Sequence, residues 1–334
     1  MPVRALWYRA GTLSLLDQRA LPARTVVLRL RRAEDVAEAI RTLTVRGAPS
    51  IGVAAAYGMV LARREGRLGP ARAAKLLRAT RPTAVDLFVG IEAVRLAWEG
   101  GGDVEAAADE YRQRVVDECH RIGNAGAHLL RRAHRVLTHC NAGALATVEW
   151  GTALAPIRVA RERGAHLFVW VDETRPLLQG SRLTAWELAR ERIPHAVIAD
   201  NAAGHYLATG QVDAVLVGAD RIARNGDFAN KIGTYEKAVV AHENGVPFYV
   251  AAPWSTFDAR RPNGRTIPVE ERSENEVLEL SGRRIAPGRS HARNPAFDVT
   301  PAKYVTAFVT PAGVLSPPEL ARALGRRASH TGGA

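Results

Sequence analysis

One thiol and three carboxyl groups in this chain come directly after short β-branched, apolar runs. They are Cys140 after RVLTH, Asp172 after HLFVWV, Asp200 after HAVIA and Asp220 after DAVLVGA. Each run predicts a β-strand. Ligands of an open parallel sheet bind beyond the carboxyl ends of its strands, so we expect these four side chains to share one rim. A thiol and a carboxylic acid meeting there could carry acid–base chemistry.

Each of these residues also has a structural alternative. Cys140 lies in THCNAGALAT, where a strand gives way to a helix-forming run, and a helix N-terminus can lower the pKa of a thiol. Buried structural cysteines are common, however, and Cys119, inside an amphipathic helical pattern, is expected to be one. Aspartates that end strands often cap the following helix. His139 alternates with Cys140 on the predicted strand and should face away from the rim.

A second set of residues could bind an anion or a hydroxyl group. Asn230 and Lys231 are predicted to open a helix over 230–244, where free N–H groups attract phosphate. Arg46, Gly47 and Ala48 precede a helix that Pro49 opens, and Arg81 also stands before a helix start. Gln179 follows a predicted strand and offers both ends of its amide. Taken singly, each cation could equally be a solvated surface residue.

The elements that must position these residues differ between the two parts of the chain. Five amphipathic runs predict helices over 33–43, 49–64, 69–79, 83–100 and 103–122, preceded by a short strand pair that includes residues 26–30. From residue 135 onward, apolar strands alternate with helical stretches, which indicates a parallel sheet covered on both faces. We therefore predict an α/β protein, with a mainly helical domain over 1–134 and a Rossmann-like doubly wound domain over 135–334.

Composition and missing motifs exclude several classes of protein. The chain has 334 residues, with 46 basic and 34 acidic residues and a net charge of +12, but its arginines are dispersed rather than clustered with aromatic residues. We therefore expect no nucleic-acid partner. Only two cysteines occur, no signal-like or membrane-spanning run develops, and a cytoplasmic location is expected. GxGxxG after the first strand, GxxxxGK[ST], HExxH and Cys/His clusters are all missing, so we expect neither a metal nor another cofactor.

Several long motifs, taken together, resemble the methylthioribose-1-phosphate isomerases of methionine salvage. They are RGAPSIGVAAAYG, RPTAVDLF, THCNAGALAT, DETRPLLQGSRLTAWEL, VGADRI, NGDFANKIGTYEKA, VPFYVAAPWSTFD, IPVEER and NPAFDVTPA. The resemblance runs from about Leu13 to Pro311. The wider superfamily includes ribose-1,5-bisphosphate isomerases and regulatory subunits of a translation-initiation exchange factor, which share the NKIGT segment.

The resemblance implies an aldose–ketose isomerase that acts on 5-methylthioribose 1-phosphate as a homodimer, without metal or cofactor. It also implies that Cys140 and Asp220 are the catalytic pair. The implied substrate-binding positions are Arg46, Gly47, Ala48, Arg81, Gln179, Asn230 and Lys231. One departure from the family pattern is Asp86, where asparagine is usual.

A phosphate on the anomeric carbon prevents spontaneous ring opening, so an enzyme of this kind must open the furanose itself. We hypothesise that an apolar environment holds Asp220 protonated, so that it donates to the ring oxygen, and that Cys140 assists proton or hydride transfer between C2 and C1. Three residues are candidates for an apolar pocket around a methylthio group: Tyr57, Phe228 and Trp254. Ribose 1,5-bisphosphate or 5-deoxyribose 1-phosphate as substrate, and a non-catalytic regulatory subunit, remain the alternatives.

Overall fold

A small antiparallel sheet begins the chain. The computed structural model describes residues 2–81 and 85–331, the last seven of them by their backbone alone. The sheet has three strands, β1 (Leu6–Arg9), β2 (Thr12–Leu16) and β3 (Val27–Leu30), in that order. The sequence predicted a strand pair, and the additional strand escaped notice because each strand is only four or five residues long.

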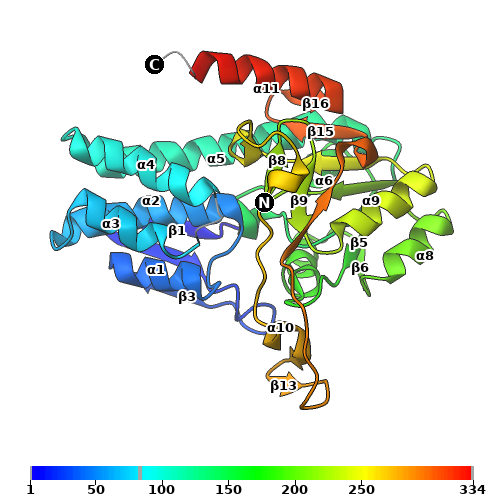
Figure 1. Ribbon diagram of the computed structural model, residues 1–334, viewed down its shortest axis with the longest axis horizontal. Coiled ribbons are helices and arrows are strands. Elements are labelled where there is room, and N and C mark those ends of the chain that lie inside the picture. The colour runs from blue at the N-terminus through cyan, green and yellow to red at the C-terminus, as the bar shows by residue number, and fades with distance from the viewer. Residues whose placement is uncertain (1, 82–84, 332–334) are drawn as a thin grey trace.

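The five predicted helices of the N-terminal part are confirmed. They are α1 (Ala33–Arg41), α2 (Ala48–Glu65), α3 (Pro70–Arg78), α4 (Val85–Glu99) and α5 (Val104–Gly126). Residues 83 and 84, predicted to begin the fourth helix, lie outside the described residues. Proline in the first turn of α2 and a left-handed Gly66 after its last turn mark the two ends of that helix. In Figure 1, α1 to α4 gather on one side of the molecule and α5 runs from them toward the large sheet.

The six strands predicted in the second part form the parallel core of a seven-stranded sheet. They are β4 (Arg135–Thr138), β5 (Phe168–Asp172), β6 (His195–Ile198), β7 (Ala214–Val217), β10 (Phe248–Ala251) and β15 (Ala307–Thr310). The sheet order is β16-β15-β10-β7-β4-β5-β6, and only the added edge strand β16 (Gly313–Leu315) is antiparallel. In chain order, β4, β5 and β6 lie one after another toward one edge of the sheet, and β7, β10 and β15 lie one after another toward the other edge. This is the doubly wound order, with its switch point between β4 and β7.

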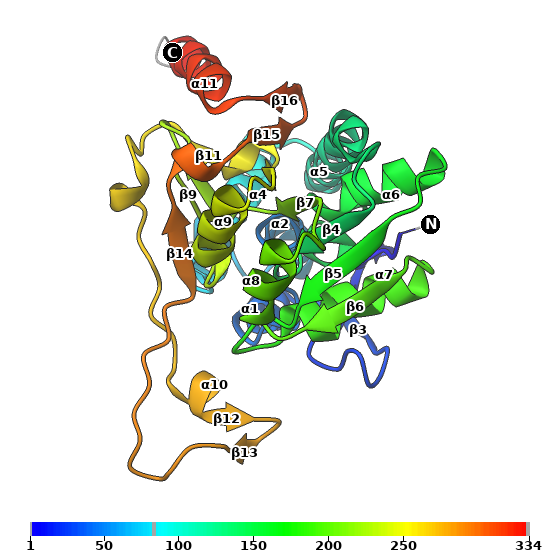
Figure 2. The same cartoon turned by 90° about the vertical axis from the view of Figure 1, so that its right-hand side faces the viewer.

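Alternate residues of the sheet enter two separate hydrophobic cores. Val136 and Leu216 pack on one face with residues of α5 and of α6 (Leu154–Glu162). Leu137 and Val215 pack on the other face with α8 (Ala202–Ala208), α9 (Thr234–Glu243) and α11 (Pro317–Thr331). Figure 2 shows α5 and α6 on one side of the sheet and α8 and α9 on the other. Burial on both faces explains why these strands are apolar throughout rather than alternating.

A second, four-stranded sheet was not predicted. Its order is β11-β8-β9-β14, formed by β11 (Phe257–Asp258), β8 (Arg221–Ala223), β9 (Phe228–Lys231) and β14 (Phe297–Thr300). Between β11 and β14 the chain extends away from the body as an arm that carries α10 (Asn275–Leu278) and the hairpin of β12 (Glu279–Leu280) and β13 (Arg283–Arg284) (Figures 1 and 2). Within the described part of the chain, no helix combines the length and apolar character that crossing a membrane requires.

Candidate active site

A cavity of about 270 Å³ opens at the switch point of the large sheet. Its walls come from the beginning of α2, from the loops after β4 and β7, and from strand β9. All nine residues predicted to form the site line this one cavity: Arg46, Gly47, Ala48, Arg81, Cys140, Gln179, Asp220, Asn230 and Lys231. The cavity is of the size that encloses a small ligand.

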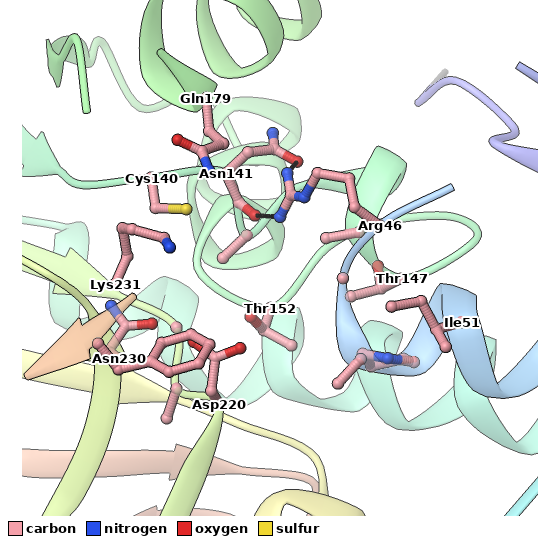
Figure 3. A pocket seen from close by; sticks show the side chains of 18 of the residues that line it. Arg46, Ile51, Cys140, Asn141, Thr147, Thr152, Gln179, Asp220, Asn230 and Lys231 are labelled. Atoms are coloured by element: carbon pink, nitrogen blue, oxygen red, sulfur yellow. Dashed lines mark hydrogen bonds between the residues drawn. The ribbon is translucent and has the colours of Figure 1, made fainter. Parts of the chain in front are cut away.

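Cys140 and Asp220 follow the two strands that flank the switch point. β4 ends at Thr138 and β7 ends at Val217, so both side chains stand just beyond the carboxyl end of the sheet. Figure 3 shows the Cys140 thiol pointing into the cavity beside the end of the Lys231 side chain. Lys231 interacts electrostatically with both Cys140 and Asp220, which places the three groups around one space.

Desolvation and the neighbouring cations shift the pKa of Asp220 in opposite directions. The carboxyl is accessible through the cavity, yet desolvation by the surrounding protein raises the pKa of Asp220 above its usual range. The cations Lys231, Arg46 and Arg81 partly counteract this rise. Burial also lowers the pKa of Lys231, and the nearby Cys140 and Asp220 oppose that change. The direction of the shift at Asp220 is the one that a proton donor requires.

Arg46 stands just before helix α2 and is held by Asn141, a residue that the sequence analysis did not predict. Its guanidinium donates from Nη1 to the side-chain oxygen of Asn141 at 2.8 Å and from Nη2 to the Asn141 carbonyl at 2.7 Å (Figure 3). Gly47 caps the helix with φ of 89°, and a β-carbon there would lie 2.5 Å from the Cα of Ala146. The start of an 18-residue helix therefore approaches the loop after β4 closely, with its N–H groups toward the cavity.

Asn230 and Lys231 lie on a strand, which corrects the prediction that they open a helix. They end β9, and α9 begins only at Thr234. The N-terminus of α9 is already occupied, because Asp298 accepts hydrogen bonds from the N–H groups of Gly233 at 2.7 Å and Tyr235 at 3.1 Å. These two site residues therefore contribute side chains to the cavity rather than a helix terminus.

The ammonium of Lys231 is held at the wall of the cavity by two contacts. Its Nζ donates to the carbonyl of Ala296 at 2.8 Å and lies 4.9 Å from the centre of the Phe297 ring. Gln179 lies across from β9 in Figure 3, and its buried side-chain oxygen has no hydrogen-bond partner among the described residues. An unpaired buried amide oxygen is costly, so it is a ready acceptor for a ligand hydroxyl.

Of the other strand-end carboxylates, Asp172 and Asp200 serve the framework of the site. Asp172 is buried and lies 2.9 Å from Nδ1 of His139 and 3.4 Å from the ammonium of Lys237. Asp200 accepts the N–H groups of Thr174 at 2.7 Å and Arg175 at 2.6 Å. Asp172 and Asp200 are thus held by these contacts, and neither of them lines the cavity.

His139 is among the residues that line the cavity, but its imidazole is buried and is bonded to the framework of the site. Its Nδ1 lies 2.9 Å from Asp172, and its Nε2 donates to the carbonyl of Ile232 at 2.8 Å. The predicted apolar lining was wrong. Tyr57 and Phe228 belong to two hydrophobic cores, and Trp254 packs on Phe257 at a ring distance of 5.1 Å. The apolar wall comes instead from a different set: Leu43, Ile51, Leu177, Leu183, Ile267, Pro268 and Phe297.

Comparison with known proteins places the chain in a family. The model of the initiation factor 2 subunit family matches residues 44–317. A methylthioribose-1-phosphate isomerase of Roseiflexus sp. (strain RS-1) is 51% identical over 339 aligned residues, which cover 94% of this chain and 95% of that protein. The chain belongs to the methylthioribose-1-phosphate isomerase family.

Two solved structures agree with the family at the level of the fold. The 5-methylthioribose 1-phosphate isomerase of Pyrococcus horikoshii OT3 superposes with a TM-score of 0.91 at 42% identity, covering 98% of this chain and 96% of that chain. A protein described as translation initiation factor eIF-2B, subunit delta, from A. fulgidus superposes with a TM-score of 0.87 at 43% identity, covering 97% and 99%. The fold is therefore shared by relatives whose names differ in function.

Two buried residues, Glu187 and Arg158, hold Asn141 and the loop after β4 in this isomerase-family site. Glu187 is fully buried and accepts hydrogen bonds from the Asn141 amide at 2.8 Å and from the backbone of Ala144 at 2.7 Å. Arg158, also buried, neutralises Glu187 at 2.7 Å. The two charges lie 29 residues apart in the sequence, so spacing alone offered no signal for the pair. Asn141, by contrast, could have been found from its place in the Asn-Ala-Gly turn after Cys140.

Proposed function

We propose that this chain is an aldose–ketose isomerase that converts 5-methylthio-D-ribose 1-phosphate to 5-methylthio-D-ribulose 1-phosphate in methionine salvage. The observation that carries the proposal is the convergence of nine residues, from distant motifs, on one cavity at the switch point of the sheet. Full-length relatives at about half identity carry the name of this activity.

The phosphate group binds where positive charge and backbone donors meet. The opening of α2 supplies N–H groups from Gly47 and Ala48, and the guanidinium groups of Arg46 and Arg81 add charge. The sugar hydroxyls are bound by Gln179, Asn230 and Lys231, whose side chains line the opposite wall. Most of this binding acts equally on substrate and transition state, so it chiefly sets KM.

Asp220 opens the ring. Desolvation raises its pKa and so favours the protonated carboxyl, which can donate a proton to the ring oxygen as the bond between C1 and that oxygen breaks. Lys231 and the arginines limit this rise, which leaves a donor that can release its proton. Cys140 then supports transfer between C2 and C1, either by moving a proton or by stabilising the charge of a hydride shift.

The apolar wall favours a methylthio group over a second phosphate at C5. Leu43, Ile51 and Ile267 offer no donor or charge to a phosphate, whereas a thioether gains from their contact. Arg182 also lines the cavity, but its guanidinium already donates hydrogen bonds to the backbone carbonyls of Leu21 and Arg19. Two other cations that line the cavity are also engaged, since Arg19 pairs with Asp17 at 2.8 Å and Arg272 with Glu276 at 2.6 Å. A second phosphate would have to compete with these carboxylates.

One panel assay tests the proposal against its alternatives. Purified protein is given 5-methylthioribose 1-phosphate, 5-deoxyribose 1-phosphate and ribose 1,5-bisphosphate, and the ketose formed is measured. We expect the highest kcat/KM for the methylthio compound. Preference for the bisphosphate would move the assignment to the related isomerase, and no turnover of any of the three would favour the non-catalytic regulatory subunit.

We also infer from the family resemblance that the protein is a cytoplasmic homodimer. Light scattering of the purified chain at several concentrations tests the oligomeric state, with a dimer expected throughout. A monomeric mass at working concentrations would contradict the homodimer. Fractionation of the source cells tests the location.

A further inference from the structure

Cys140 has a backbone conformation that its side chain disfavours. Its φ is 65°, in the left-handed region, where a β-carbon costs about 1 to 2 kcal/mol. β4 ends at Thr138, so the ladder of the sheet does not hold Cys140 in place. A residue kept in this region at a functional cavity requires surrounding groups that impose the conformation.

Two buried threonines supply those groups. The hydroxyl oxygen of Thr174 accepts the N–H of Cys140 at 2.9 Å, and the hydroxyl of Thr184 donates to the Cys140 carbonyl at 2.6 Å. Both threonines are completely buried. They reach Cys140 from different segments, Thr174 from the loop after β5 and Thr184 from the π-helical turn η3 (Gly180–Thr184).

Each hydroxyl is itself anchored on its other side. Thr174 donates to the carbonyl of Asp172 at 3.0 Å, and Thr184 accepts the Asn141 amide at 3.2 Å. Thr174 is also left-handed, with φ of 66°, and the carboxylate of Asp200 holds its N–H at 2.7 Å. The geometry of Cys140 thus depends on two directed hydrogen bonds that require a hydroxyl group and that an apolar residue cannot make.

We propose that Thr174 and Thr184 are positioning residues, which clamp the N–H and the carbonyl of Cys140 so that its thiol faces the cavity beside Lys231. The clamp rests on the proposed catalytic role of Cys140 but concerns the orientation of its thiol, which is measurable without turnover. Without the clamp, Cys140 relaxes toward the extended region, and its thiol leaves the ammonium that attracts its anionic form.

The test compares variants that remove or keep each hydroxyl. Thr174→Val and Thr184→Val keep the shape and lose the hydrogen bonds, whereas Thr174→Ser and Thr184→Ser keep the hydroxyl. Thr138→Val is the matched control, because Thr138 is equally buried on β4 and its hydroxyl donates to the Leu216 carbonyl at 2.8 Å rather than to Cys140. Thermal unfolding of each variant confirms that it is folded.

Two readouts are measured on every variant. The rate of alkylation of Cys140 by iodoacetamide, assigned by peptide mass spectrometry, is expected to fall at least fivefold in both valine variants and to stay within twofold of the wild type in the serine variants and Thr138→Val. In the isomerase assay, we expect kcat to fall at least tenfold in the valine variants, with KM within threefold.

The outcomes separate the clamp from the proposed function. Unchanged alkylation in the valine variants overturns the clamp, as does an equal loss in Thr138→Val, which would reduce the effect to a general loss of packing. If the wild type turns over none of the sugar phosphates, the proposed function fails, while the alkylation rates still decide whether the threonines orient the thiol.

Discussion

Asp220 is the residue whose protonation state controls the proposed ring opening. Asp220→Asn keeps the shape of the side chain but cannot give up a proton, so we expect kcat to fall about 10²- to 10⁴-fold. Binding of the ketose product, measured by calorimetry, should change little because the uncharged amide fits the same place. In the wild type, kcat should decline as pH rises through the raised pKa of Asp220, since the donor form is lost. A variant with near-normal kcat would remove Asp220 from the chemistry.

The role of Cys140 depends on whether a proton or a hydride moves between C2 and C1. A thiol in the open cavity can exchange its proton with solvent, so a proton route carried by Cys140 would place deuterium at C1 of the ketose in heavy water. Mass spectrometry and NMR of the product measure this. We expect deuterium at C1 if the thiol relays a proton, and an unlabelled C1 would assign Cys140 to electrostatic support of a hydride shift.

Asp86 couples the stability of the fold to pH. This fully buried carboxyl on α4 has its pKa raised to about 6 by desolvation, which the Ser255 side chain partly offsets. The folded state holds the proton of Asp86 more tightly than the unfolded chain does. The contribution of this group to the free energy of unfolding is therefore fully present below about pH 4 and is lost as pH rises through 6. The loss amounts to about 3 kcal/mol.

Asp86→Asn should therefore raise Tm at pH 8 and bring no gain at pH 4. Asparagine keeps the size and removes the charge that burial disfavours. Asp103→Asn is the matched control, because asparagine is an equally good N-cap at the exposed start of α5, and Tm should change little at either pH. Equal effects of Asp86→Asn at both pH values would show that its charge is not what limits stability.

At the scale of elements, the start of α2 can lie close to Ala146 because residue 47 is a glycine. A β-carbon on Gly47 would lie 2.5 Å from backbone and side-chain atoms of Ala146, and the φ of 89° adds strain. Gly47→Ala should cost more than about 3 kcal/mol and weaken product binding, because helix α2 must move away from the loop after Cys140.

Gly66→Ala, at the other end of α2, provides the comparison. Gly66 has φ of 70°, but a β-carbon there meets no atom within 4 Å, so only the backbone cost of about 1 kcal/mol applies. Chemical denaturation measures both variants. Equal destabilisation by the two substitutions would mean that the close approach to Ala146 does not fix the helix.

The elements also show which parts of the site could be predicted from sequence. Strands buried on both faces are apolar runs with clear ends, so β4 and β7 and the residues that follow them were found. Strand β9 reads FANK, with a buried asparagine and lysine that look like a helix start, and its partner β14 lies 66 residues later. Pairing over such a separation leaves no local pattern. The threonines beside Cys140 were missed for the same reason.

At the scale of the whole molecule, the cavity joins the helical part to the large sheet. Arg46 and Arg81 come from the first part of the chain, and Cys140 and Asp220 come from the second. Helix α5 packs against α2 and α4 and also against α6 and β15, so the two parts share a structural element. Helix α5 belongs to the predicted domain over 1–134 but also packs on the predicted domain over 135–334. We therefore predict that the two parts unfold together.

Scanning calorimetry with and without the ketose product tests this coupling. We expect one transition, which shifts upward as a whole, because a ligand held by both parts stabilises only the assembled structure. At a product concentration 100 times its Kd the stabilisation is about 2.7 kcal/mol, which corresponds to a shift of about 4 °C for a chain of this size. Arg46→Ala, which removes a contact from the helical part, should reduce the shift at the same product concentration. Two transitions, of which product moves only the one belonging to the sheet, would place the ligand on the sheet alone and contradict a site shared between the two parts.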